Sequence, residues 1–247
     1  MKTILITGCS SGFGKEIAKY FLERDWKVVA TMRTPREDVL PVSENLQILP
    51  LDVTDAESIR KAVEAAGEID ALVNNAGIGL FSAVESTSLE NIREIFETNT
   101  IGTIAMIQAV LPQFKARKNG AIVNITSSVT YKPLPLLSIY RASKAAVNAF
   151  TESLALELEP LNVRVRAVLP GRAPETSFAE NAQQSRMLAI PEAYSDMAEV
   201  FMEMLQSDDP VTYSSDVSEA VWNAINDPST PVKIPAGADA VEWSKSS

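Results

Sequence analysis

The sequence contains no histidine and only one cysteine, Cys9, among its 247 residues. Without imidazole, a Ser-His-Asp triad is impossible, and so is a zinc site built on imidazole or on several thiolates. A single cysteine cannot form an internal disulfide, which is compatible with a reducing compartment. Proton chemistry in this chain must therefore use tyrosine, lysine, aspartate, glutamate or cysteine, and we expect no metal site.

Positive charge is also scarce, because 22 lysines and arginines face 32 aspartates and glutamates, giving a formal net charge of −10. A nucleic-acid partner needs a basic face, and anionic membranes attract basic segments, so we expect neither partner. No apolar stretch reaches the length of a membrane span, and the apolar run after Met1 is too short for a signal peptide. The default expectation is a cytoplasmic protein.

Short, β-branched apolar runs alternate with longer helical patterns along the chain, which predicts a parallel sheet covered by helices on both faces. The runs 4–6 and 121–123 are continuously apolar, as expected of strands that are buried on both sides. No repeat or linker interrupts the pattern, so we predict one doubly wound α/β domain over residues 1–247, with about seven strands and a variable substrate loop region at about 172–210. The predicted strands are 2–7, 27–32, 46–50, 71–74, 121–126, 163–169 and 232–234, and the predicted helices are 13–24, 56–66, 89–117 with a break near Asn99, 138–158, 191–206 and 216–226.

A glycine-rich turn follows the first predicted strand and precedes the first predicted helix. Glycine tolerates positive φ and lets a phosphate approach the backbone, and the helix that follows points free N–H groups at such an anion. Any tight turn can contain glycines, but the spacing T-G-x-x-x-G-x-G is more particular than a lone cluster. We interpret the turn as a pyrophosphate site made by Gly8, Ser10, Ser11, Gly12, Phe13 and Gly14.

The end of the second predicted strand bears on the choice of dinucleotide. In this architecture an acidic residue some twenty positions on binds the ribose of NAD, whereas an arginine there suits the 2′-phosphate of NADP. The strand ends in Met32-Arg33, with no carboxylate at its tip. Arg36 and Lys15 could add charge nearby. Arg33 could also be a solvated surface charge, but the missing acid favours NADP(H).

Tyr140 and Lys144 are four residues apart on a predicted helix and therefore lie on one face. Tyrosine has a pKa near 10, and a neighbouring ammonium favours the phenolate and lowers that pKa. Ser127 ends a strand beside this helix, so its hydroxyl could bind a substrate oxygen. The alternative is a solvated surface pair. The upstream serine, the glycine turn and the absence of histidine favour a proton-transfer site.

Taken in order, these motifs resemble the classical short-chain dehydrogenase/reductase family, and the resemblance covers nearly the whole chain. The opening TGCSSGFG is similar to the steroid- and retinol-dehydrogenase branch, and a carbonyl-reductase-like branch is the alternative. The resemblance implies a Rossmann-type fold and the NADP(H)-dependent interconversion of a ketone or aldehyde and an alcohol. The motifs that carry it are T-G-x-x-x-G-x-G, LDVTD at 51–55, NNAG at 74–77, Asn99, Ser127, Tyr140-x-x-x-Lys144 and Pro170-Gly171.

The resemblance also implies roles for single residues. Tyr140 would be the catalytic acid/base, with Ser127, Lys144 and Asn99 completing a tetrad. Lys144 would also bond the nicotinamide ribose, and Asn99 would hold a water that links Lys144 to solvent. The implied cofactor contacts are Asp52 and Val53 at the adenine, Asn74, Asn75, Ala76 and Gly77 along the adenosine ribose, and Pro170, Gly171 and Ala173 near the nicotinamide.

The chain departs from the family pattern after Pro170-Gly171. The family usually has a threonine after three further residues, to hold the nicotinamide carboxamide. Here Arg172-Ala173-Pro174-Glu175 precede Thr176, so the threonine comes one residue late. This departure puts Thr176 in question as a cofactor ligand and suggests a reshaped loop.

The substrate side is defined less sharply, because such pockets are built from variable loops. We expect an apolar small-molecule substrate with a carbonyl or alcohol group, and a homo-oligomer, either a dimer or a tetramer. Two other functions are compatible with the fold, namely a non-catalytic NADP(H) sensor that binds a partner and an epimerase or dehydratase. A sensor has no need of the Asn, Ser, Tyr and Lys set, and the glycine spacing of the epimerase branch usually differs. The candidate pocket residues are Phe81, Val129, Tyr131, the stretch 133–137, Phe178, Met202 and Met204.

Overall fold

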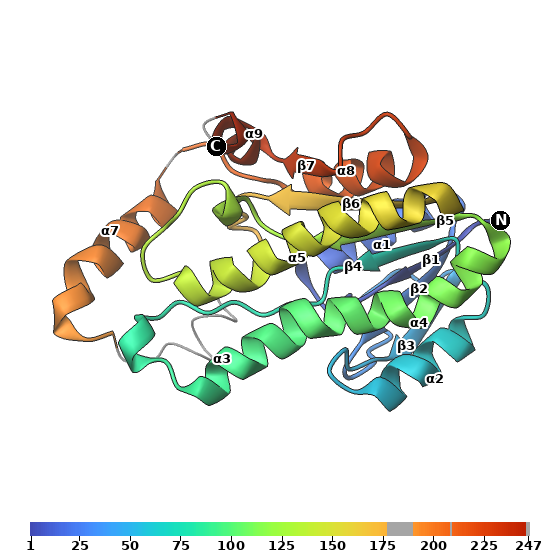
Figure 1. Ribbon diagram of the computed structural model, residues 1–247, viewed down its shortest axis with the longest axis horizontal. Coiled ribbons are helices and arrows are strands. Elements are labelled where there is room, and N and C mark those ends of the chain that lie inside the picture. Colours follow the sequence, from blue (N-terminus) through green and yellow to red (C-terminus); the bar gives the residue numbers. More distant parts are fainter. Residues whose placement is uncertain (177–189, 208, 246–247) are drawn as a thin grey trace.

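The sheet of this protein has seven strands, all parallel, in the order β3-β2-β1-β4-β5-β6-β7. The computed structural model describes residues 1–176, 190–207 and 209–245 (Figure 1). This arrangement confirms the predicted doubly wound parallel sheet. The strands are β1 (Thr3–Ile6), β2 (Lys27–Met32), β3 (Leu46–Pro50), β4 (Ala71–Asn74), β5 (Gly120–Ile125), β6 (Val163–Pro170) and β7 (Lys233–Ala236).

The helices lie where the sequence predicted them, with one addition. The break near Asn99 is a π-helical turn, Glu97–Ile101, between α3 and α4. Asp55 caps α2 by accepting hydrogen bonds from the backbone N–H groups of Glu57 (2.8 Å) and Ser58 (3.3 Å). The short helix α9 was not predicted. The helices are α1 (Gly12–Leu22), α2 (Ala56–Ala66), α3 (Leu89–Phe96), α4 (Gly102–Arg117), α5 (Ser138–Leu158), α7 (Ser195–Gln206), α8 (Ser214–Asn226) and α9 (Ala238–Ser244).

Two apolar layers hold the sheet between its helices. Ile4 and Ile6 of β1 pack into the layer formed with α1 and α8, whereas Leu5 packs into the layer formed with α2, α4 and α5. Successive side chains of a strand point to opposite faces, so a strand covered on both sides must be apolar throughout. All three side chains are fully buried, as their continuous apolar run predicted.

The strand order reverses between β1 and β4, and this reversal fixes where a ligand can enter. In open parallel sheets, ligands bind outside the carboxyl ends of the strands at such a point. In Figure 1 the strands point toward the end of the molecule where α3 and α7 lie. Within the described part of the chain, no helix is both long enough and apolar enough to cross a bilayer.

Candidate active site

A cavity of about 930 Å³ opens at the carboxyl edge of the sheet. Residues from the segments that follow β1, β2, β3, β4, β5 and β6 line this cavity, together with residues of α5. Most of the residues predicted for the site therefore share one cavity. The predicted residues at its surface are Gly8, Ser10, Ser11, Gly12, Phe13, Arg33, Asp52, Val53, Asn75, Ala76, Gly77, Ser127, Tyr140, Lys144, Pro170, Gly171 and Ala173.

The glycine turn presents bare backbone at the start of α1. Gly8 has a φ of +74°, which disfavours a side chain, and a Cβ on Gly14 would lie 2.4 Å from the Gly8 carbonyl oxygen. Asn75 fixes the turn by donating to the carbonyls of Thr7 (2.9 Å) and Gly8 (3.0 Å). Thr7 in turn accepts from the backbone N–H groups of Asn75 (3.0 Å) and Ala76 (2.9 Å). Such a rigid, unobstructed turn fits the pyrophosphate of a dinucleotide.

Neither Asn74, at the end of β4, nor Cys9, within the glycine turn, lines the cavity. Asn74, expected near the adenosine ribose, is instead buried in the sheet and donates to Asn124 Oδ1 at 2.9 Å. Cys9 is fully buried, and burial raises the pKa of its thiol to about 12. Neither side chain is therefore exposed to a ligand in the cavity.

Arg33 stands exposed after β2, at the cavity surface, with no carboxylate at the tip of that strand. Asp52, which was expected at the adenine, accepts hydrogen bonds from the backbone N–H and the hydroxyl of Thr54 at 2.9 and 2.7 Å. These hydrogen bonds lower the pKa of Asp52, and the charge of Arg33 adds to the effect. Arg36 instead donates to the Ser10 carbonyl at 3.3 Å and supports the glycine turn.

Tyr140 is buried at the cavity, with 7% of its surface exposed. Burial raises the pKa of its phenol above the ordinary value of 10, and a hydrogen bond with Ser127 opposes the increase. The prediction that Lys144 lowers this pKa is wrong for the protein alone, because desolvation of the phenolate outweighs the opposing hydrogen bond. The phenol of Tyr140 therefore keeps its proton at neutral pH.

Lys144 lies one turn further along α5, also buried at the cavity. Its Nζ donates to the Ile125 carbonyl at 3.0 Å, and burial lowers the pKa of its ammonium to about 8. A Cβ on Gly77 would lie 3.2 Å from this Nζ, so the segment after β4 passes close to the lysine. Tyr140 and Lys144 thus share one helix face and one cavity, as their spacing predicted.

Asn99 lies in the π-helical turn, a feature that often occurs at functional sites. Its side chain accepts from the Ile78 N–H (2.8 Å) and donates to the Ile78 carbonyl (2.9 Å) and the Ser143 hydroxyl (3.1 Å). It therefore ties the segment after β4 to α5 and is not among the residues that line the cavity. Its water-holding role stays a prediction.

Thr176 reaches the cavity although it comes one residue late in the sequence. Thr176 is buried, and its hydroxyl donates to the Ala173 carbonyl at 2.8 Å. A Cβ built on Gly12 would lie 3.6 Å from the Cβ of Thr176. The longer loop thus brings the threonine next to the glycine turn. Contact with a nicotinamide stays untested.

Mostly apolar side chains line the remaining part of the cavity, to which Glu94, Thr98 and Arg172 also contribute. The rings of Phe81 and Phe201 stack with centroids 4.5 Å apart, and they join the segment after β4 to α7. Trp243 of α9 was missed, because nothing in this short segment signals that its tryptophan reaches a cavity. The apolar or aromatic lining residues in this part include Leu80, Phe81, Val129, Leu134, Leu137, Phe201, Met202, Met204, Leu205 and Trp243.

Two candidate pocket residues stand apart from this lining. Tyr131 is not at the cavity surface, and burial raises its pKa while the nearby charges of Lys233 and Glu152 act in opposite directions. Tyr131 directly follows the 3₁₀-helical turn Ser128–Thr130. Phe178 lies outside the described residues.

The match to a protein family agrees with this geometry. Residues 2–186 match the family of short chain dehydrogenases. The chain is 39% identical over 197 residues to the 3-ketodihydrosphingosine reductase of Bacteroides thetaiotaomicron, covering 78% of this chain and 71% of that protein. It is also 38% identical over 181 residues to human retinol dehydrogenase 8, covering 69% of this chain and 58% of that relative's length.

Solved structures extend the match to nearly the whole chain. A short-chain dehydrogenase from Streptomyces avermitilis superposes with a TM-score of 0.85 at 29% identity, covering 98% of this chain and 90% of that one. A serine dehydrogenase complexed with NADP+ gives 0.81 at 29% identity, covering 96% and 95%. A 3-ketoacyl-(acyl-carrier-protein) reductase from Brucella melitensis complexed with NADH gives 0.79 at 27%, covering 95% and 96%. With its parallel sheet, glycine turn and buried Ser127, Tyr140 and Lys144, this chain belongs to the short-chain dehydrogenase family of oxidoreductases.

Proposed function

We propose that this protein is an NADP(H)-dependent oxidoreductase that interconverts an apolar ketone or aldehyde and the corresponding alcohol, with Tyr140 as general acid/base. The observation that carries the proposal is a single cavity with Arg33 and the glycine turn together with Ser127, Tyr140 and Lys144. The names of the relatives, a 3-ketodihydrosphingosine reductase and a retinol dehydrogenase, support chemistry between a carbonyl and an alcohol. The apolar lining supports an apolar substrate.

The residues divide the chemistry between them. The dinucleotide, when bound, supplies the hydride that the carbonyl carbon accepts. Ser127 orients the carbonyl oxygen through its hydroxyl, and Tyr140 donates its proton to that oxygen as the alcohol forms. Burial keeps the phenol protonated and excludes water from the reacting oxygen. Lys144, with a pKa of about 8, is an acid of suitable strength to replace that proton near neutral pH.

The glycine turn would hold the pyrophosphate, and Arg33 would select the cofactor. A guanidinium forms two charge-assisted hydrogen bonds to a phosphate, whereas a ribose hydroxyl carries no charge and cannot accept such a bidentate pair. Such a contact is worth about 1.5–3 kcal/mol, so we expect a preference for NADPH over NADH of roughly tenfold to over a hundredfold. The finding of both NADP+ and NADH in solved relatives makes this preference the point to measure.

Arg33→Ala tests the cofactor choice. The Michaelis constant for NADPH should rise while that for NADH stays almost unchanged, because only the 2′-phosphate contact is lost. Arg60→Ala is the matched control, since Arg60 is an exposed arginine on α2 that pairs with Glu57 and does not line the cavity. Equal weakening of both cofactors would show that Arg33 only covers the adenine. A wild-type preference for NADH would reject the NADP assignment.

Tyr140→Phe tests the catalytic role. The variant keeps the buried ring and loses only the phenol hydroxyl, so the fold and NADPH binding should stay nearly intact. Turnover of a ketone panel should fall by about two to four orders of magnitude, the range for one acid–base group. A variant that keeps more than about a tenth of the wild-type rate contradicts the assignment.

A further inference from the structure

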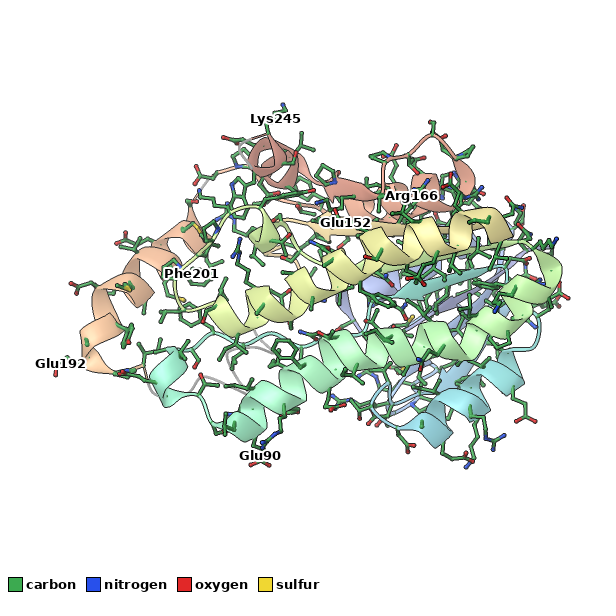
Figure 2. The ribbon with its side chains drawn as sticks, in the orientation of Figure 1. Glu90, Glu152, Arg166, Glu192, Phe201 and Lys245 are labelled. Atoms are coloured by element: carbon green, nitrogen blue, oxygen red, sulfur yellow. The ribbon has the colours of Figure 1, made fainter. Side chains whose placement is uncertain are left out.

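Helix α7 forms one side of the apolar part of the cavity, yet it lies away from the sheet. Phe201, Met202, Met204 and Leu205 line the cavity from this helix. In Figure 1, α7 lies at the far end of the molecule, beyond the carboxyl edge of the strands, and Figure 2 shows Phe201 on it. A helix that is not packed on the sheet needs another anchor to hold its cavity-lining face at a fixed distance from the reacting groups.

Arg172 supplies such an anchor at the C-terminal end of α7. Its guanidinium donates to the Met204 carbonyl, to the Ser207 hydroxyl (3.1 Å) and carbonyl (3.0 Å), and to the Asp209 carbonyl (2.7 Å). The last carbonyls of a helix have no partner within the helix and carry a partial negative charge. The half-buried guanidinium, with several donors in a fixed planar fork, bonds one of these carbonyls, that of Met204, and complements the charge of the helix end.

The backbone of Arg172 is held as firmly as its side chain. Its N–H donates to the buried carboxylate of Asp239 at 2.6 Å, and its carbonyl accepts from the Thr212 N–H at 2.7 Å. Thr212 also donates to the other carboxylate oxygen of Asp239 at 2.7 Å and accepts from the Gly171 N–H at 2.9 Å. The backbone of Arg172 is thus held in place directly after Pro170-Gly171, and its guanidinium reaches the C-terminal end of α7.

We propose that Arg172 is a positioning residue that sets the place of α7 relative to the Pro170-Gly171 turn and thereby the fit of larger apolar substrates. The inference rests on the proposed carbonyl chemistry for its substrate part, but the contacts between Arg172 and α7 are independent of it. A small ketone would need only Ser127 and Tyr140, whereas a long one would also need the apolar face of α7. Loss of Arg172 should therefore affect large substrates selectively.

The test compares Arg172→Ala, Arg172→Lys and a matched control, Arg166→Ala. Arg166 also extends from β6 and donates to backbone carbonyls, those of Thr230 (3.0 Å) and Pro228 (3.5 Å), but it lies near α8, away from α7 (Figure 2). Amide hydrogen exchange would be followed over 195–205. Michaelis constants would be measured for 2-butanone and 2-undecanone with NADPH, and NADPH affinity by fluorescence titration.

In Arg172→Ala we expect exchange over 195–205 to quicken by roughly tenfold or more, because several charge-assisted hydrogen bonds to the helix end are lost. The Michaelis constant for 2-undecanone should rise by at least about tenfold, while the value for 2-butanone and the NADPH affinity change less than about threefold; such factors match the loss of hydrogen bonds to a charged group. Arg172→Lys should give intermediate values, since it keeps the charge but loses the fork. The control should leave all of these values near wild type.

Unchanged exchange over 195–205 in both Arg172 variants would overturn the proposal, as would an equal rise in the Michaelis constants of the two ketones. If Arg172→Ala does not fold, Arg172→Lys decides by the same measurements. A wild-type protein that reduces neither ketone would reject the proposed substrates, and the exchange result alone would then decide whether Arg172 positions α7.

Discussion

Replacing Lys144 by methionine should make the protein more stable while it removes activity. Burial lowers the pKa of this lysine from its ordinary value of 10.5 to about 8. At 1.36 kcal/mol per unit, the buried charge costs about 3 kcal/mol at neutral pH. Methionine keeps most of the length, but it loses the hydrogen bond to the Ile125 carbonyl, worth about 1 kcal/mol. The expected net gain is about 2 kcal/mol at pH 7.

The pH dependence of this gain has a definite sign. Below pH 8 the lysine is charged in both the folded and the unfolded state, so the cost of burying the charge is fully present. Between pH 8 and 10.5 the folded lysine is neutral while the unfolded lysine still holds its proton. The unfolded state then binds more protons, so the stability of the wild type rises with pH in this window. The advantage of Lys144→Met should shrink accordingly.

Urea unfolding of both proteins at pH 7 and pH 10 measures the effect, and equal m-values make the midpoints comparable. The reasoning is refuted if Lys144→Met is no more stable than wild type at pH 7. It is also refuted if the difference in unfolding free energy is as large at pH 10 as at pH 7. The rate of ketone reduction by Lys144→Met should be measured as well. A more stable but inactive variant would show that the charged lysine is kept for activity at the cost of stability.

Three further outcomes can be checked. Gly14→Ala should weaken NADPH binding and lower stability by about 1–3 kcal/mol, since its Cβ would lie 2.4 Å from both the Gly8 carbonyl oxygen and Asn75 Nδ2; a titration and an unfolding curve that match wild type would contradict this. Phe201→Ala removes one ring of the aromatic stack and should raise kcat/KM for benzophenone relative to 2-butanone, whereas Val200→Ala, at a residue 63% exposed on the same helix, should not. An unchanged ratio in Phe201→Ala would argue that the stack does not limit substrate size. Light scattering should give at least twice the chain mass of 26.8 kDa, and a monomer mass would refute the expected homo-oligomer.

The fold was predictable because its elements are separated by clear local signals. The bounds of β2, β3, β4, α2 and α5 agree with the predicted ranges, since apolar runs and helical periodicity end at polar or turn-forming residues. The break near Asn99 was predicted as well. Helix α9 was not, because seven residues with little apolar periodicity resemble a loop, and the helix forms where Asp239 bonds to the β6 end.

The candidate site was predictable where its chemistry is local in sequence. The glycine turn and the pair Tyr140 and Lys144 depend on spacing alone, and the structure brings them to one cavity. The raised pKa of Tyr140 was not predictable, because it depends on how completely the folded protein excludes water from the phenol. The contacts of Arg172 and the position of Trp243 depend on segments that meet only in the folded chain.

The buried thiol of Cys9 offers a way to measure local opening of the glycine turn by chemical labelling. The thiolate is the nucleophile that attacks a disulfide reagent, and burial leaves almost no thiolate at neutral pH because it raises the thiol pKa to about 12. Cys9 is the sole cysteine of the sequence, and it lies within the turn between β1 and α1. The rate at which a reagent such as dithionitrobenzoate labels the native chain therefore measures how often this turn opens. A dinucleotide that rests on the turn would slow that labelling in proportion to its occupancy, without any turnover being measured.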